Sequence, residues 1–234
     1  DRHGNRGATS KSGSADVLEA AGINLALSAE QIATTIEQVG VGFMFAPAHH
    51  SAMKHVIAAR KEIGVRTVFN ILGPLTNPAA APNQIIGVFD PQLIPILLEV
   101  LRDLGSDHVL IVAAEDGLDE ISIAAATAVG ELRGGEIYSY TVSPEDFGIK
   151  QYANYDELKI DSAEASLTLM RQALTYENKA AGDIVALNAG AAIFAANLED
   201  SLLNGVKRAQ EVLISGAALA KLDELVRCSN SMSE

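Results

Sequence analysis

The chain contains 234 residues, of which 48% are hydrophobic, and this is enough to bury one large globular core. Its formal net charge of −13 argues against a nucleic-acid surface, and no stretch has the uncharged apolar length of a membrane span. The only cysteine, Cys228, excludes an internal disulfide framework and favours a reducing compartment. We therefore expect a cytoplasmic protein whose partners are neither nucleic acids nor membranes.

The amino-terminal run of sixteen residues has the composition of a phosphate-binding loop. Its glycines allow the backbone to approach an anion closely, while hydroxyls and N–H groups at a helix start donate to phosphate oxygens. Its cations neutralise the phosphate charge, and the run leads directly into a helix pattern over 15–20. The cations are Arg2, Arg6 and Lys11, and the hydroxyls are those of Thr9, Ser10, Ser12 and Ser14.

The remaining chain alternates between helix and strand patterns, which indicates an α/β fold. Ser28 and Gln31 form a capping-box pattern at the start of one helix, and the apolar run 108–114 is typical of a strand covered on both faces. We expect a central, mostly parallel sheet with helices on both faces. The expected helices cover 28–40, 51–64, 91–105, 162–176, 183–198 and 203–227, with Gly182-Asp183 separating the helix at 162–176 from the helix at 183–198. Strands are expected at 65–71, 84–89 and 108–114, together with a strand pair around Gly134 and Gly135 within 121–142.

Arg60 interrupts the apolar face of the helix expected at 51–63. Its spacing from Met53 and Ile57 is compatible with two interpretations. The arginine could lay its stem on the apolar face and extend its head into water, which is the more common arrangement. Alternatively, its planar guanidinium could bind a carboxylate carried on a hydrophobic body.

Four carboxylates fall within the six residues 115–120, directly after the most apolar strand. Ligands collect at the carboxyl ends of strands in open α/β sheets, and Mg²⁺ typically takes one or two carboxylates together with water and phosphate oxygens. A solvated acidic turn is the alternative in a chain this acidic. The presence of a phosphate-binding pattern in the same chain favours the metal interpretation, because a phosphate site and a magnesium site imply each other.

Five runs of residues together resemble the anthranilate phosphoribosyltransferase family, within the nucleoside phosphorylase/phosphoribosyltransferase superfamily. The resemblance covers nearly the whole chain and implies the large α/β domain of that family. It implies transfer of the phosphoribosyl group of 5-phosphoribosyl 1-diphosphate to the amine of anthranilate, with Mg²⁺ as cofactor, in tryptophan biosynthesis. The runs are 3–6, 10–16, 42–47, 69–78 and 117–120.

The resemblance also implies roles for individual residues, although it singles out no catalytic side chain. Asn5 and Arg60 would contact anthranilate, and Asp119 with Glu120 would hold the metal. The phosphoribosyl diphosphate contacts would come from Arg2, His3, Gly4, Asn5, Arg6, Gly7, Ala8, Thr9, Ser10 and Ser14.

Family members carry a small helical domain and a glycine-rich loop before the first of these runs, so we expect this sequence to be a fragment with little activity alone. We expect one catalytic domain over 1–234, with about 41–80 packing against the missing helical domain, and a disordered tail at 229–234. The intact protein would be a homodimer. The alternatives are a pyrimidine nucleoside phosphorylase-like enzyme and a non-catalytic relative that binds nucleic acid.

Overall fold

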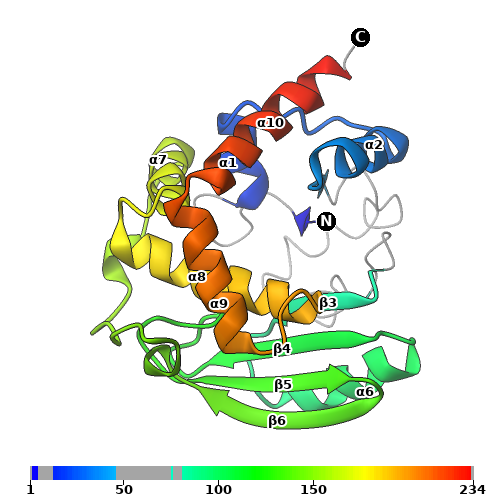
Figure 1. Ribbon diagram of the computed structural model, residues 1–234, viewed down its shortest axis with the longest axis vertical. Helices are drawn as coiled ribbons and strands as arrows, with labels where there is room; N and C mark the ends of the chain where they lie inside the picture. Colours follow the sequence, from blue (N-terminus) through cyan, green and yellow to red (C-terminus); the bar gives the residue numbers. More distant parts are fainter. Residues whose placement is uncertain (1, 5–12, 46–74, 76–80, 233–234) are drawn as a thin grey trace, which may run out of the picture. The chain divides into compact units, whose positions relative to one another are not determined.

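A computed structural model of the protein describes residues 2–4, 13–45, 75 and 81–232, and for 2–4 it describes the backbone alone (Figure 1). The chain divides into two compact units. The first comprises Asp1–Ala79, Ile160–Arg171 and Ala218–Glu234, and the second comprises Ala80–Lys159 and Gln172–Ala217. The expectation of one catalytic domain over the whole chain stays a prediction.

A four-stranded sheet forms the centre of the second unit (Figure 1). Its strand order is β3-β4-β5-β6, with β3 parallel to β4 and the other two pairs antiparallel. All seven residues of β4 are buried, as the apolar run predicts. The strands are β3 (Asn83–Gly87), β4 (His108–Ala114), β5 (Thr127–Arg133) and β6 (Glu136–Val142).

The sheet is less parallel than the sequence predicts in the part of the chain that the structure describes. Gly134 and Gly135 both have positive φ (58° and 84°), which a tight two-residue turn requires, so β5 and β6 form a hairpin. In this sheet β3 and β4 form the one parallel pair, while β4 and β5 and also β5 and β6 pair antiparallel. The α/β class with a central sheet flanked by helices is confirmed.

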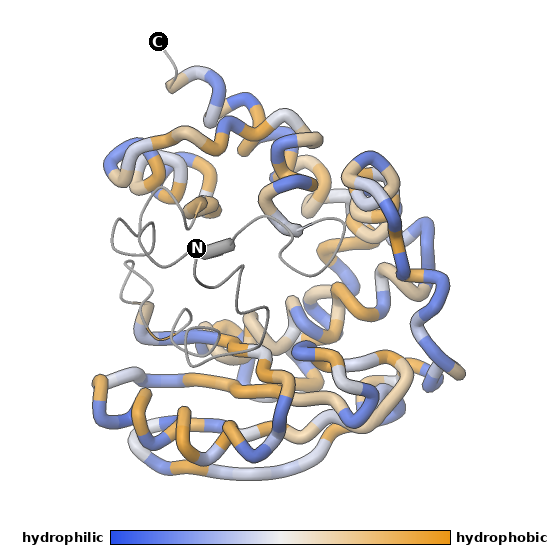
Figure 2. Tube along the Cα trace, turned by 180° about the vertical axis from the view of Figure 1, so that it is seen from behind, coloured by the Kyte–Doolittle hydropathy of each residue, from blue (hydrophilic) through white to orange (hydrophobic). Residues whose placement is uncertain are grey.

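Helices cover both faces of this sheet. Helix α6 (Leu93–Asp103) packs on β4 and β5, and the absence of a side chain at Gly130 lets Ile94 and Leu98 approach the strand. Figure 2, seen from behind, shows hydrophobic and hydrophilic residues alternating along this amphipathic helix. Helix α8 (Lys179–Ala195) packs on the other face, where its Leu187 joins the hydrophobic cluster that contains Leu110 of β4. Successive side chains of a strand point to opposite faces of the sheet, so the strand residues that contact α8 alternate with those that face α6.

Two glycines allow α8 to cross α9 (Leu202–Ile214) at very short range. A Cβ on Gly190 would lie 2.5 Å from the backbone of Val206, and a Cβ on Gly205 would collide with the carbonyl oxygen of Gly190. Val206 itself is fully buried at this crossing. The second unit also contains two short 3₁₀ helices, Pro144–Phe147 and Asp156–Leu158.

In the first unit, β1 (Arg2–Gly4) pairs in parallel with β2 (Phe43–Phe45). The capping box of α2 (Ala29–Val39) forms as predicted: Gln31 N–H donates to Ser28 Oγ, and Ser28 N–H donates to Gln31 Oε1. The other described helices of this unit are α1 (Ser14–Ala20), α7 (Ala163–Leu174), which ends in the second unit, and α10 (Ala217–Ser231), whose first residue belongs to the second unit.

Three helix boundaries differ from the prediction. Gly182 and Asp183 do not separate two helices; both are buried inside α8, which begins four residues earlier. The helix expected at 203–227 is two helices, because Gly216 adopts φ 75° between α9 and α10. The predicted tail begins too early, since α10 continues to Ser231 and Ser229 is buried.

The helix expected at 51–64 and the strand expected at 65–71 lie outside the described residues. Among the helices that the structure does describe, none is long and apolar enough to cross a membrane.

We expect Gly190→Ala to destabilise the protein. Alanine gains about 1 kcal/mol of helix propensity over glycine, but its methyl group would meet the Val206 backbone, and overpacking of this kind costs about 1–3 kcal/mol or more. The free energy of unfolding from urea denaturation should therefore fall. Ala192→Ser, at an exposed position on the same helix, is the control and should change it by less than about 0.5 kcal/mol.

Candidate functional site

The predicted phosphate-binding run is described at its two ends. Arg2, His3 and Gly4 form β1, and Ser14 is the first residue of α1. Asp16 Oδ2 accepts a hydrogen bond from the N–H of Gly13 at 2.8 Å, so this acidic residue of the run satisfies a backbone donor at the N-terminus of α1. Asn5, Arg6, Gly7, Ala8, Thr9 and Ser10 lie outside the described residues.

Arg60 also lies outside the described residues. The predicted anthranilate contacts, Asn5 and Arg60, and the predicted phosphoribosyl diphosphate contacts therefore stay predictions.

The acidic segment forms a compact turn at the carboxyl end of β4. The N–H of Ala114 donates to the carbonyl of Leu118, and Gly117 adopts φ 87° within the turn. Asp119 and Glu120 are exposed at its far end. The two residues predicted to hold a metal are thus presented to solvent on a hydrogen-bonded backbone.

Asp116, the second acidic residue of the segment, contributes to the turn itself. Its Oδ1 accepts from the N–H of Leu118 at 3.3 Å and its Oδ2 accepts from the hydroxyl of Ser122 at 2.5 Å. Its carboxylate is therefore already engaged by the protein. Of the four carboxylates in the segment, those of Glu115, Asp119 and Glu120 belong to exposed residues.

The last residue of β3 leaves room for the acidic turn. A Cβ placed on Gly87 would collide with the carbonyl oxygen and carbonyl carbon of Asp119. Glycine at this position therefore lets the Asp119 backbone rest directly against the strand.

Asn188, on α8, makes three hydrogen bonds beside the acidic turn, two of them to Ile121. The N–H of Ile121 donates to Asn188 Oδ1 at 2.9 Å, and Asn188 Nδ2 donates to the carbonyl of Ile121 at 3.0 Å. The same Nδ2 donates to the carbonyl of Ile184 at 3.0 Å. Asn188 carries no recognisable signal in the sequence, because its partner Ile121 lies 67 residues earlier in the chain.

The donor set at the turn fits Mg²⁺ better than a transition metal. No cluster of three or more His, Cys, Asp or Glu side chains arranged to hold a metal occurs within the described ranges. Asp119 and Glu120 are adjacent and exposed. Two carboxylates suit Mg²⁺, which completes its coordination shell with water and substrate oxygens.

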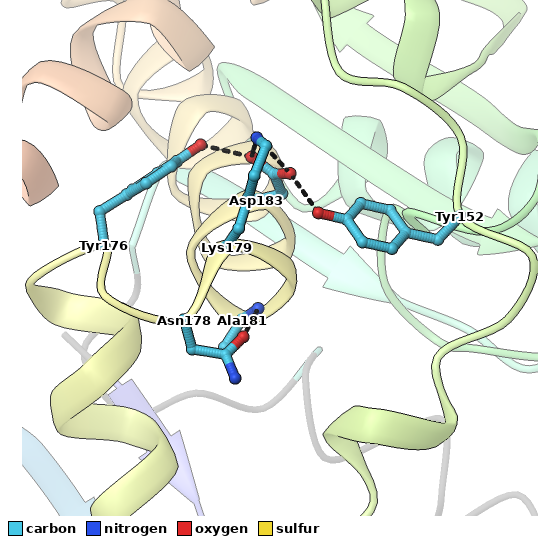
Figure 3. Close-up of polar contacts among 6 residues, drawn as sticks. All are labelled: Tyr152, Tyr176, Asn178, Lys179, Ala181 and Asp183. Atoms are coloured by element: carbon cyan, nitrogen blue, oxygen red, sulfur yellow. Dashed lines mark hydrogen bonds and ion pairs between the residues drawn. The ribbon is translucent and has the colours of Figure 1, made fainter.

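The buried carboxylate of Asp183, in the first turns of α8, forms hydrogen bonds with two tyrosines outside the helix (Figure 3). Its oxygens accept from the hydroxyl of Tyr152 at 2.8 Å and from the hydroxyl of Tyr176. Lys179 Nζ lies 3.0 Å from Asp183 Oδ2 and keeps most of its side chain in solvent. Asn178 caps the helix by accepting from the N–H of Ala181 at 3.0 Å.

Burial and the neighbouring Asp183 carboxylate raise the pKa of both Tyr152 and Tyr176 above the ordinary value of about 10. In each case burial is the largest cause, followed by the hydrogen bond and negative charge of Asp183, which disfavour the phenolate. Both hydroxyls therefore stay protonated donors at neutral pH.

A surface hollow of about 650 Å³ lies elsewhere in the second unit, along β5 and β6 and the start of α9. Glu131 and Tyr140 line it, and the Tyr140 hydroxyl donates to Glu131 Oε2 at 2.8 Å. The other oxygen of Glu131, Oε1, lies 3.1 Å from Nε2 of the buried His108. Neither Asp119 nor Glu120 lines this hollow, so it is distinct from the predicted metal position.

Comparison with known proteins gives consistent matches over nearly the whole chain. A model of the "Glycosyl transferase family, a/b domain" matches residues 1–219. An anthranilate phosphoribosyltransferase from Hahella chejuensis is 58% identical over 100% of this chain and 68% of its own length. The anthranilate phosphoribosyltransferase of Thermus thermophilus matches in structure with a TM-score of 0.90 and 43% identity, over 97% of this chain and 68% of that chain.

A more distant structural match is anthranilate phosphoribosyltransferase from Saccharomyces cerevisiae in complex with PRPP and Mg. It has a TM-score of 0.87 and 25% identity, over 98% of this chain and 64% of that chain. Other curated relatives are 54% identical over 97% of this chain, which covers 66% of their length. The chain thus spans about two thirds of the length of the curated relatives it matches.

We expect the protein to lose stability in alkali through the Asp183 cluster. The pKa of Tyr152 and of Tyr176 is higher in the folded than in the unfolded state. Their contribution to the free energy of unfolding is therefore fully present below about pH 10 and is lost as pH rises further. Urea denaturation from pH 8 to pH 11 should show a falling free energy of unfolding above about pH 10.

Tyr152→Phe should make this alkaline decline shallower, because the variant lacks one of the two hydroxyls. Tyr138→Phe, at an exposed tyrosine, is the matched control for removing a phenol. An identical decline in wild type and Tyr152→Phe would contradict the assignment.

Proposed function

The chain belongs to the anthranilate phosphoribosyltransferase family, and we propose that the complete protein transfers the phosphoribosyl group of 5-phosphoribosyl 1-diphosphate to the amine of anthranilate. The products would be N-(5-phosphoribosyl)anthranilate and diphosphate, in tryptophan biosynthesis. The observation that carries the proposal is the exposed pair Asp119 and Glu120, held on a hydrogen-bonded turn at the carboxyl end of the buried strand β4.

Substrate binding is assigned to two groups of residues. Asn5 and Arg60 would hold anthranilate, the arginine through a two-pronged contact with the carboxylate. The donors and cations of the amino-terminal run would hold the phosphates of the other substrate. These are Arg2, His3, Gly4, Asn5, Arg6, Gly7, Ala8, Thr9, Ser10 and Ser14.

Asp119 and Glu120 would hold Mg²⁺, which supplies charge neutralisation on the diphosphate leaving group. The Saccharomyces cerevisiae relative in complex with PRPP and Mg supports this cofactor. We also propose that the complete protein is a homodimer and acts in the cytoplasm.

The reaction needs no covalent link to the enzyme. A C–N bond forms between the anthranilate amine and the anomeric carbon as the bond from that carbon to the diphosphate oxygen breaks. The diphosphate leaves with the electron pair of that bond, and the amine releases one proton to solvent. Asn5 and Arg60 would aim the amine at the anomeric carbon, while the amino-terminal run holds the phosphates still. Positioning and electrostatic stabilisation would therefore supply most of the acceleration.

The complete protein can be tested by incubating it with anthranilate, 5-phosphoribosyl 1-diphosphate and MgCl₂. We expect anthranilate fluorescence to decay as diphosphate accumulates in equal amount. Phosphorolysis of thymidine, or salt-sensitive retention of DNA at physiological ionic strength without this transfer, would replace the proposal with one of the two alternatives.

We expect Arg60→Ala to raise the KM for anthranilate by about 10- to 100-fold, since a hydrogen-bonded contact to a charged group contributes about 1.5–3 kcal/mol. The KM for 5-phosphoribosyl 1-diphosphate should change little. Steady-state kinetics would measure both values, with Arg208→Ala, which removes an exposed ion pair with Glu199, as the control. An unchanged anthranilate KM would remove Arg60 from the binding site.

A further inference from the structure

We propose that Asn188 is a positioning residue that holds the Asp119–Glu120 pair in the orientation needed to bind a metal–diphosphate substrate. The inference rests on the proposed function. It assigns a role to a side chain on α8 that would touch neither the metal nor the substrate.

The contacts of Asn188 act on the backbone at the point where the acidic turn ends. Its amide oxygen accepts from the N–H of Ile121 at 2.9 Å, and its amide nitrogen donates to the carbonyl of the same residue at 3.0 Å. The Ile121 side chain is 1% exposed and belongs to the hydrophobic core of the second unit. Ile121 is therefore held both by core packing and by both of its polar backbone groups.

The N–H of Ile121 shares a planar peptide unit with the carbonyl of Glu120. The bond from Asn188 therefore fixes the peptide that follows Glu120. The peptide that precedes Glu120 contains the carbonyl of Asp119, which rests against Gly87 without room for a Cβ between them. Both peptide planes that flank Glu120 are thus held, one from α8 and one from β3.

The two flanking planes determine where the Glu120 side chain projects, because only φ and ψ of Glu120 lie between them, and the first of these planes also contains the Cα of Asp119. Asp119 and Glu120 themselves are exposed, so burial in the core does not orient them. The backbone restraints from Asn188 and Gly87 therefore preorganise the positions from which the two carboxylates extend.

Asparagine suits this position because its amide both donates and accepts. Asn188→Ala removes both bonds to Ile121 as well as the bond to Ile184, and leaves the N–H of the buried Ile121 without its partner. Asn188→Asp keeps an acceptor for that N–H but loses the donor to the Ile121 carbonyl. The two variants therefore remove the restraint in different degrees.

The test uses the complete protein and measures the binding of 5-phosphoribosyl 1-diphosphate by calorimetry at increasing MgCl₂ concentrations. We expect Asn188→Ala to raise the MgCl₂ midpoint about tenfold, as loss of an outer-shell partner typically does. Asn188→Asp should raise it less. Hydrogen exchange of the Ile121 amide should accelerate in Asn188→Ala, which is a second readout independent of catalysis.

Asn178→Ala is the matched control, because it removes the cap of the same helix while leaving the contacts of Asn188 with Ile121 in place. It should lower the thermal midpoint and leave the MgCl₂ midpoint within about twofold of wild type, since a helix cap stabilises the fold alone. An equal shift of the MgCl₂ midpoint in Asn178→Ala and Asn188→Ala would show general destabilisation and overturn the positioning role.

A wild-type midpoint in Asn188→Ala, or in Asn188→Asp if the alanine variant does not fold, would overturn the inference and leave the proposed function standing. Wild-type protein that binds 5-phosphoribosyl 1-diphosphate at no MgCl₂ concentration would instead overturn the proposed function and the inference together.

Discussion

Ten of the seventeen residues of α8 are buried, because this helix packs against β3 and β4 as well as against α9. Leu187 and Ala191 join the hydrophobic core from one side, and Gly190 allows the close crossing with α9. The helix is apolar around most of its circumference, as expected for one enclosed by other elements. Because α8 also carries Asp183 and Asn188, its packing determines where two inward-reaching polar groups lie.

The polar groups on α8 differ from Asp119 and Glu120 of the acidic turn in their exposure to solvent. A buried carboxylate is costly unless it is hydrogen-bonded, and Asp183 meets this condition with two tyrosine hydroxyls and an ammonium group. Asn188 uses its amide entirely on backbone groups. Asp119 and Glu120 remain exposed, so a ligand can approach them directly from solvent. The carboxylate of Asp183 and the two carboxylates proposed to hold Mg²⁺ thus differ in burial.

Much of the second unit could be predicted from local sequence. The continuous apolar run of β4 and the Gly134–Gly135 pair predict a buried strand and a hairpin, and both are present. The acidic segment at the end of β4 was also recognisable, because its residues are consecutive. The start of α8 was not, since Gly182 looks like a helix boundary until the ring of Tyr176 is found packed against it. A glycine that admits a neighbouring ring and one that ends a helix look alike in a sequence.

The capping box of α2, the buried strand β4 and membership of the family could be read from the sequence, because each depends on residues close together in the chain or on runs kept in order. Tertiary structure alone decided that Asn188 meets Ile121 and that Gly87 lies under Asp119. Asn188 and Ile121 are 67 residues apart in the chain. In both pairs one residue lies on a helix or strand, α8 or β3, and the other lies in or directly after the acidic turn. Periodicity reports which face of an element is apolar, but the partner of a polar side chain is set only when packing brings distant backbone within hydrogen-bonding distance.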